Sequence, residues 1–269
     1  MPDTKGCITV DGKKFHYLRS VLRAECGDMI YVRIPNGKLQ QMTVAKIDIA
    51  SSRIILTVAG ESTCTGVSAA PVEDVPQVGL WLFQFIAKPQ KMELIIRQAV
   101  ECGAEAVVPV AGEFCQGGCI ESAKKRLLDS DTRWKRIITE AREQSGSPVD
   151  TKILPAVSVQ EACTLWKAHT DECKGKTFAT VLYEQSAMTV PFHKAAGLFI
   201  EENTNLHCTA VMTGAEGGIS PNEIELVRQY GFIPVHLKTN ILRCETAALY
   251  GMAVMQNVIT ESGLWQLRK

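Results

Sequence analysis

The sequence predicts an α/β protein in which a small β-rich module precedes a larger domain built on a mostly parallel sheet. One reason is length, because 269 residues exceed what most single hydrophobic cores hold and suit two domains. The other is a change in the pattern of apolar residues: it predicts short strands with turn signals over 1–70, and strands that alternate with helices over 80–269. Between them, 71–79 contains two prolines and two acids without an apolar period, so we predict a linker there.

The first module is predicted to be a small β-barrel with one short helix. Four apolar residues recur at helical spacing within 13–28, and Gly27 closes this predicted helix. An Asn-Gly turn separates the first two strands. The predicted strands are 29–34, 39–49 and 54–60.

The larger domain is predicted to consist of repeated strand and helix units. The apolar run at 80–87 fits a strand buried on both faces, and the helix at 90–103 has one apolar stripe. The other predicted strands are 106–111, 152–157, 178–184, 207–213 and 232–237, and the other helices are 121–144, 159–168, 192–203, one opening at 220, and 241–259. This alternation predicts a mostly parallel sheet covered by helices on both faces.

Charge and hydropathy predict a soluble, cytoplasmic protein without a membrane partner. The 29 Lys and Arg residues balance 29 Asp and Glu residues, so no global positive field indicates a nucleic-acid partner, although a basic face could still exist. The N-terminus lacks the basic-then-apolar order of a signal peptide. No apolar run approaches the roughly 20 residues that span a bilayer.

The ten cysteines are scattered along the chain, a pattern typical of reduced thiols. Cys115 and Cys119 could form half of a zinc site. Their possible partners, His169 and Cys173, lie about 50 residues further on, whereas compact zinc sites use tighter spacing. We therefore predict no metal.

The segment "TGAEGGIS" at 213–220 is the most specific feature of the sequence. It lacks the lysine of a P-loop, and Glu216 would repel a phosphate. It also lies far from the first βα turn, where a dinucleotide fingerprint belongs. Ser220, Pro221 and Glu223 match an N-cap, a first-turn proline and the acid of a capping box. A plain tight turn with a solvated Glu216 is the simpler alternative.

Two further strand exits, 181–185 and 236–251, give this loop the context of a binding site. The carboxyl ends of parallel strands are where α/β sheets bind ligands. If the three exits are adjacent, they form one crevice rich in main-chain donors and acceptors, because glycines let a ligand approach the backbone closely. Such a crevice suits an adenosine-like ligand.

The same segments resemble the 16S ribosomal RNA uridine-N3 methyltransferases, the RsmE family of the SPOUT class. Residues 213–220 resemble the family's Gly-Pro-Glu-Gly-Gly segment, and 237–247, "LKTNILRCETA", its Leu-Gly-x-Arg-Ile-Leu-Arg-x-Glu-Thr-Ala segment. Residues 16–28 are similar to the N-terminal His-x-x-x-Val-Leu-Arg-x-x-x-Gly-Asp pattern. Residues 88–110 and 133–148 match further segments in order, so the resemblance covers nearly the whole chain.

The resemblance implies a PUA-like N-terminal barrel that helps to hold RNA, a C-terminal domain tied in a deep trefoil knot, and a homodimer. It implies S-adenosylmethionine, bound in a bent form by the knot loops, and methyl transfer to N3 of a uridine in small-subunit ribosomal RNA. The cofactor-binding residues that it implies are Leu182, Tyr183, Thr213, Gly214, Glu216, Gly217, Gly218, Leu237, Ile241, Leu242, Arg243, Cys244 and Thr246.

The implied reaction removes the imide proton of a uridine, so a base and a nearby cation would lower the barrier. Glu216 is the candidate base and Arg243 the candidate electrostatic partner. The two could instead pair with each other, and the proton could be lost to water. The cations expected to contact RNA are His16, Arg19, Arg23, Arg33, Lys88, Lys91, Arg133, Arg136 and Arg142.

Departures from the family pattern keep alternatives open. Ala215 replaces a proline, Lys238 a glycine, Asn240 a basic residue and Cys244 a common threonine. A non-catalytic RNA-binding relative, or a SPOUT methyltransferase with another RNA target, therefore remain alternatives. The last helix offers an apolar set for oligomerisation or for ordinary core packing: Leu249, Met252, Val254, Met255 and Val258.

Overall fold

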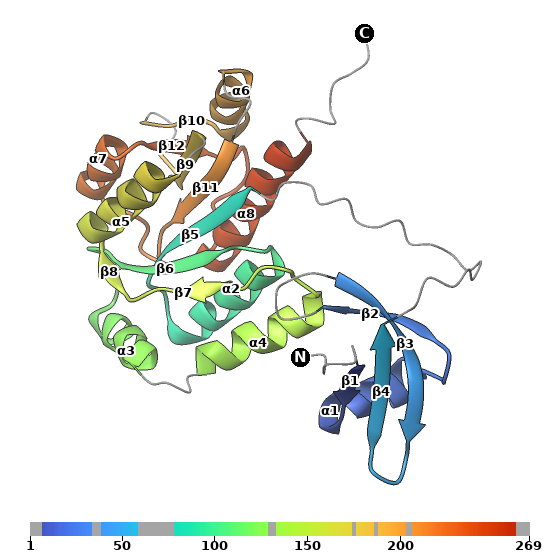
Figure 1. Cartoon of the computed structure of the whole chain (residues 1–269). Coiled ribbons are helices and arrows are strands. Elements are labelled where there is room, and N and C mark those ends of the chain that lie inside the picture. The colour runs from blue at the N-terminus through green and yellow to red at the C-terminus, as the bar shows by residue number, and fades with distance from the viewer. Residues whose placement is uncertain are drawn as a thin grey trace. The chain divides into compact units, whose positions relative to one another are not determined.

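The chain forms two compact units, Met1–Val75 and Pro76–Lys269 (Figure 1). The computed structural model describes residues 7–33, 39–58, 78–128, 133–173, 176–185, 188–202 and 206–261. Most of the predicted linker, 71–77, lies outside these ranges. None of the helices within them combines the length and the apolar character that a bilayer span requires.

The first unit is an antiparallel sheet with a short helical segment packed beside it. Its elements are β1 (Cys7–Val10), α1 (Gly12–His16), the π-helical turn η1 (Tyr17–Val21), β2 (Met29–Arg33), β3 (Leu39–Asp48) and β4 (Arg53–Val58). The strand order is β1-β4-β3-β2, and the core contains Phe15, Met42, Ile54 and Leu56. In the described residues the sheet is open, with β1 and β2 at its edges.

The helix predicted over 13–28 is shorter than expected. Helical turns end at Val21, and Arg23 has a φ of 53°, in the left-handed region that L-residues adopt at the end of a helix rather than within it. The predicted Asn-Gly turn lies outside the described residues.

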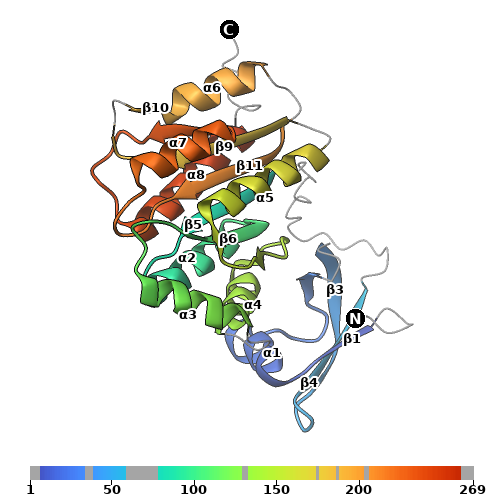
Figure 2. The same ribbon diagram turned by 90° about the vertical axis from the view of Figure 1, so that its left-hand side faces the viewer.

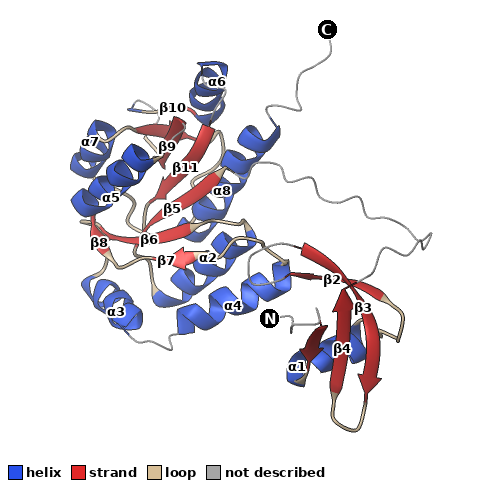
Figure 3. Ribbon diagram, viewed as in Figure 1, coloured by secondary structure: helices blue, strands red, loops and turns tan. Residues whose placement is uncertain are grey.

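The second unit is an α/β domain with a parallel sheet, as predicted (Figures 1 and 3). Its strands are β5 (Gly79–Phe85), β6 (Ala106–Ala111), β7 (Lys152–Ile153), β8 (Val157–Ser158), β9 (Lys176–Leu182), β10 (Val190–Pro191), β11 (Leu206–Thr213) and β12 (Phe232–His236). Their order is β10-β12-β9-β11-β5-β6-β7, with β8 also on β6, and every pair is parallel.

The helices of this unit cover both faces of the sheet (Figure 2). They are α2 (Pro89–Glu101), α3 (Gly117–Leu128), α4 (Arg133–Ser145), α5 (Val159–Glu172), α6 (Phe192–Glu202), α7 (Pro221–Gln229) and α8 (Cys244–Glu261). Side chains of β5 alternate between the faces: Leu80 and Leu82 pack with α2 and α8, and Phe83 packs with α5 and α7. This two-sided burial explains why the side chains of the strand are apolar except for that of Gln84.

Two predicted elements are each two elements in the structure. The strand predicted at 152–157 consists of β7 and β8, because Pro155 between them has no N–H for a sheet. The helix predicted at 121–144 consists of α3 and α4.

The last helix packs mainly inward. Met252 and Met255 are fully buried core residues, so they are unavailable for oligomerisation, whereas Leu249 is partly exposed. A Cβ atom on Gly251 would lie 2.9 Å from Cδ1 of Leu182 and 3.0 Å from Cγ1 of Val211. The absence of a side chain at Gly251 therefore lets α8 pack directly on the strands that lead into the site.

Candidate active site

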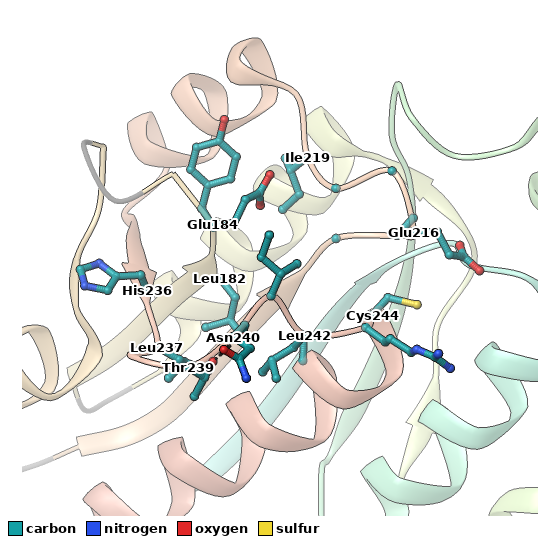
Figure 4. A pocket seen from close by; sticks show the side chains of 18 of the residues that line it. Leu182, Glu184, Glu216, Ile219, His236, Leu237, Thr239, Asn240, Leu242 and Cys244 are labelled. Atoms are coloured by element: carbon teal, nitrogen blue, oxygen red, sulfur yellow. Dashed lines mark hydrogen bonds between the residues drawn. The ribbon is translucent and has the colours of Figure 1, made fainter.

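A pocket of about 1170 Å³ lies at the carboxyl ends of β9, β11 and β12 (Figure 4). In the sheet β9 lies between the other two strands, so the three exits noted in the sequence are adjacent. The segments that line the pocket are 182–184, 214–219 and 235–244, joined by Lys91 and Ala247.

Most of the predicted cofactor-binding residues line this pocket. They are Leu182, Tyr183, Gly214, Glu216, Gly217, Gly218, Leu237, Ile241, Leu242, Arg243 and Cys244. Thr213 and Thr246 do not line it: Thr213 is fully buried below the loop, and Thr246 is exposed on the first turn of α8. The resemblance did not include Glu184 or Ile219, which also line the pocket.

The glycine loop is a compact turn closed by its own backbone. The Gly218 N–H donates to the carbonyl of Ala215 at 3.0 Å, and the two residues form an isolated bridge. Gly218 has a φ of 78°, which a residue with a side chain rarely adopts. A Cβ on Gly214 would lie 3.0 Å from the carbonyl carbon of Gly218, so the two arms of the turn approach closely only because Gly214 is a glycine.

A buried glutamine holds the start of the loop. Gln84, fully buried at the end of β5, donates from Nε2 to the carbonyls of Gly214 at 3.1 Å and Phe85 at 2.8 Å. Its Oε1 accepts from the hydroxyl of Thr213 at 2.6 Å. Thr213 thus supports the pocket from beneath through Gln84, which lies 130 positions from Gly214 along the chain.

The end of the loop is fixed by the predicted capping box. Ser220 accepts from the N–H of Glu223, and the Glu223 carboxylate accepts from the N–H of Ser220 at 2.9 Å. The other carboxylate oxygen of Glu223 accepts from the N–H of Glu113 at 2.7 Å. Glu223 therefore both caps α7 and ties the loop to the segment after β6.

Among the described residues, Glu216 forms its ion pair with Lys91 and not with Arg243, the alternative that the sequence left open. Lys91 Nζ lies 3.5 Å from Oε1 of Glu216 and 3.1 Å from Oε2 of Glu245, and the N–H of Lys88 donates to Glu216 at 3.2 Å. Figure 4 shows Glu216 pointing outward, away from Glu184 and Leu182. The side chain of Lys91 therefore joins α2 to the glycine loop and to the start of α8.

The pKa values of Lys91, Glu245 and the neighbouring Cys244 are shifted at this cluster. The hydrogen bond to Glu245 raises the pKa of the Lys91 ammonium. Burial alone would raise the pKa of the Glu245 carboxyl, but hydrogen bonds from its own backbone, Cys244 and Lys91 outweigh burial and lower it. Burial and the neighbouring Glu245 raise the pKa of the Cys244 thiol to about 12, so this thiol is protonated at neutral pH and is no nucleophile.

Glu245→Gln is expected to lower the free energy of unfolding by about 1 kcal/mol at pH 7, because it removes a charged partner of Lys91. A carboxyl whose pKa falls on folding stabilises the folded protein fully at pH values above its unfolded pKa of 4.5. This contribution disappears as the pH falls through its folded pKa. Urea denaturation should therefore show a deficit at pH 7 that shrinks below pH 4. The control Glu225→Gln removes only an exposed ion pair with Arg228 and should change little at either pH.

The predicted RNA-contacting cations differ in availability. His16, Arg23, Lys88 and Arg136 are exposed. Arg19 donates to the Ala24 carbonyl at 3.1 Å, Arg133 pairs with Glu93 at 2.7 Å, and only the backbone of Arg33 is described. Arg142 is bound by Asp150 at 2.6 Å and by the carbonyls of Ser147 and Pro148, so its side chain stabilises the segment that follows α4.

The cysteines weighed as zinc ligands do not meet their proposed partners. Cys115 contacts the backbone of Gly112 and Val110, while the ring of His169 lies 3.3 Å from the thiol of Cys208 and 3.6 Å from that of Cys173. Within the described ranges, no group of three His, Cys, Asp or Glu side chains could hold a metal ion, and the cysteines are free thiols.

Comparison with known proteins identifies relatives of this chain. Residues 74–256, more than half of the chain, match the family model for the RNA methyltransferase domain. The chain is 30% identical over 178 residues to ribosomal RNA small subunit methyltransferase E of Buchnera aphidicola from Schizaphis graminum, an alignment that spans 65% of this chain and 63% of the relative. It is 28% identical over 256 residues to the protein of the same name in Synechocystis, spanning 95% and 74% of the two chains.

A solved structure supports the fold. The crystal structure of ribosomal RNA small subunit methyltransferase E from Neisseria gonorrhoeae, bound to S-adenosylmethionine, is similar with a TM-score of 0.64 and 24% identity. The match covers 96% of this chain and 95% of that one. The likeness therefore extends over the whole described architecture rather than over the pocket alone.

Proposed function

Since this chain belongs to the RNA methyltransferase family, of the ribosomal RNA small subunit methyltransferase E type, we propose that it transfers a methyl group from S-adenosylmethionine to N3 of a uridine in 16S ribosomal RNA. The observation that carries this proposal is the pocket at three adjacent strand exits. The glycine loop and the 237–243 segment, two of the motifs that carry the resemblance, both line it.

The pocket suits S-adenosylmethionine chemically. Leu182, Ile219 and Leu242 offer apolar contacts for an adenine ring, and the glycine turn brings backbone donors and acceptors within reach of a ligand. No phosphate site is needed, because this cofactor has none. When bound, the cofactor supplies an electrophilic methyl group on a positively charged sulfur.

Glu216 and Arg243 take different parts in the proposed reaction. Glu216 is held by Lys91 and by the Lys88 N–H, so we assign to it the positioning of the glycine loop. Arg243 is exposed at the pocket and faces no ion-pair partner among the described residues. We assign to Arg243 the stabilisation of the negative charge that develops on the uridine oxygens. Water takes the imide proton.

RNA binding and assembly complete the proposal. The N-terminal unit would act as a PUA-like platform, with His16, Arg19, Arg23 and Arg33 contacting phosphates together with Lys88, Arg133 and Arg136 of the second unit. The second unit would contain the trefoil knot of its relatives. The exposed apolar side chains of Ile241, Leu249 and Tyr250 would support a homodimer that acts in the cytoplasm.

A methyl-transfer assay tests this function. The purified protein is incubated with methyl-labelled S-adenosylmethionine and either free 16S RNA or assembled small subunits, and the digested nucleosides are separated by mass spectrometry. We expect label in 3-methyluridine. RNA retention without labelled product would favour a non-catalytic RNA-binding relative, and label in another nucleoside would favour a methyltransferase with a different target.

A further inference from the structure

The pocket contains one carboxylate that is not neutralised by an ion pair. Its acidic lining residues are Glu184 and Glu216, and Lys91 binds Glu216. No ion pair joins Glu184 to a lysine or an arginine in the described part of the chain. A cationic ligand in this pocket would therefore meet a carboxylate that no ion pair neutralises, although Lys238 and Arg243 also line the pocket.

The backbone aims Glu184 at the glycine loop. The N–H of Tyr183 donates to the carbonyl of Val235 at 3.0 Å, which fixes the end of β9 beside β12. The ring of Tyr183 is buried in the core on the α5 and α7 face, whereas Leu182 packs toward the α8 face. The strand ends at Leu182 and the chain bends at Glu184, whose carboxylate lies close to Gly218 in the glycine loop.

The carboxylate of Glu184 lies against Gly218. A Cβ built on Gly218 would be 3.5 Å from Oε1 and 4.0 Å from Oε2 of Glu184. The glutamate thus reaches across from the end of β9 to the turn that follows β11, and Figure 4 shows it beside Ile219. A ligand that contacts the backbone of this turn comes within a few ångströms of a negative charge.

We propose that Glu184 makes the pocket select the sulfonium of S-adenosylmethionine over the uncharged thioether of S-adenosylhomocysteine; this rests on the proposed function. In the transfer, the N3–H proton of uridine passes to water, the N3 electron pair forms the new N–C bond, and the C–S electron pair stays on sulfur. The cofactor thereby loses its positive charge. The attraction to Glu184 ends at that moment, which weakens product binding and favours exchange for fresh cofactor.

Calorimetric titration of both ligands tests this assignment. In the wild type we expect tighter binding of S-adenosylmethionine, and in Glu184→Gln we expect the ratio of the two dissociation constants to fall by about three- to tenfold, the size of a partly screened charge interaction. The affinity for S-adenosylhomocysteine should change less than about twofold. Raising the salt concentration should reduce the wild-type ratio but not that of the variant.

Matched variants separate charge from structure. Glu184→Asp keeps the charge and should keep a preference for the sulfonium, whereas Glu225→Gln removes an exposed carboxylate outside the pocket lining and should leave both affinities unchanged. Equal weakening of both ligands by Glu184→Gln, or no change in either, would overturn charge selection. If the wild type bound neither ligand, the proposed function itself would fall, and this assignment with it.

Discussion

Gly218→Trp is expected to weaken binding of S-adenosylmethionine by at least about a hundredfold, or roughly 2.7 kcal/mol. Gly218 lines the pocket, and the Cβ of a substituted residue would point at the carboxylate of Glu184, 3.5 Å away. An indole on that atom has to occupy the space between the glycine loop and the end of β9. Calorimetric titration of the variant should therefore show no saturable heat at ligand concentrations that saturate the wild type.

Gly231→Trp is the matched control for this experiment. Gly231 has a φ of 85°, close to the 78° of Gly218, so both variants impose a similar backbone strain. No atom lies within 4 Å of a Cβ at Gly231, and this residue does not line the pocket. Retention of affinity in this control would assign the loss to pocket filling. Equal loss in both variants, or unimpaired binding by Gly218→Trp, would contradict the account.

Gln84→Leu is expected to lower the free energy of unfolding by about 3 kcal/mol, because each unpaired buried polar group costs about 1–3 kcal/mol. Gln84 is 0% exposed, and leucine cannot replace its bonds to the hydroxyl of Thr213 and to the carbonyls of Gly214 and Phe85. The loosened Gly214 should also weaken cofactor binding. Urea denaturation measures the first effect and calorimetry the second.

Thr213→Val provides the test of coupling. If Thr213 and Gln84 act as one network, the double variant should be less destabilised than the sum of the single variants, by about 1 kcal/mol or more. Strictly additive effects would mean that the hydrogen bond between them contributes little, and that the loop is positioned by other contacts.

Features that depend on short stretches of sequence are predicted well. Apart from Gln84, the strand at 79–85 has no polar side chain because both of its faces are buried, and the capping box at Ser220 and Glu223 uses residues three apart. The helix predicted over 13–28 fails at Arg23, where the backbone becomes left-handed directly after the last of the four apolar residues at helical spacing. Pro155 was a visible reason to divide the strand at 152–157, since it cannot donate to a sheet.

The supports of the pocket could not be predicted in the same way. Gln84 and Gly214 are 130 residues apart, and the Lys91 contacts with Glu216 and Glu245 join three separate elements. A local pattern contains no information on which distant polar groups meet. Glu184 had a usable signal, because it lies in the third strand exit, two residues after the predicted cofactor-binding residue Leu182.

Backbone amide hydrogen exchange, with and without S-adenosylmethionine, tests most directly the central claim that three strand exits hold the cofactor. Cofactor binding should slow exchange at 182–184, 214–219 and 237–243 together, because all three segments line one pocket. The N-terminal strands should exchange at unchanged rates. Protection confined to other parts of the chain, or saturable binding without protection of the glycine loop, would contradict the account.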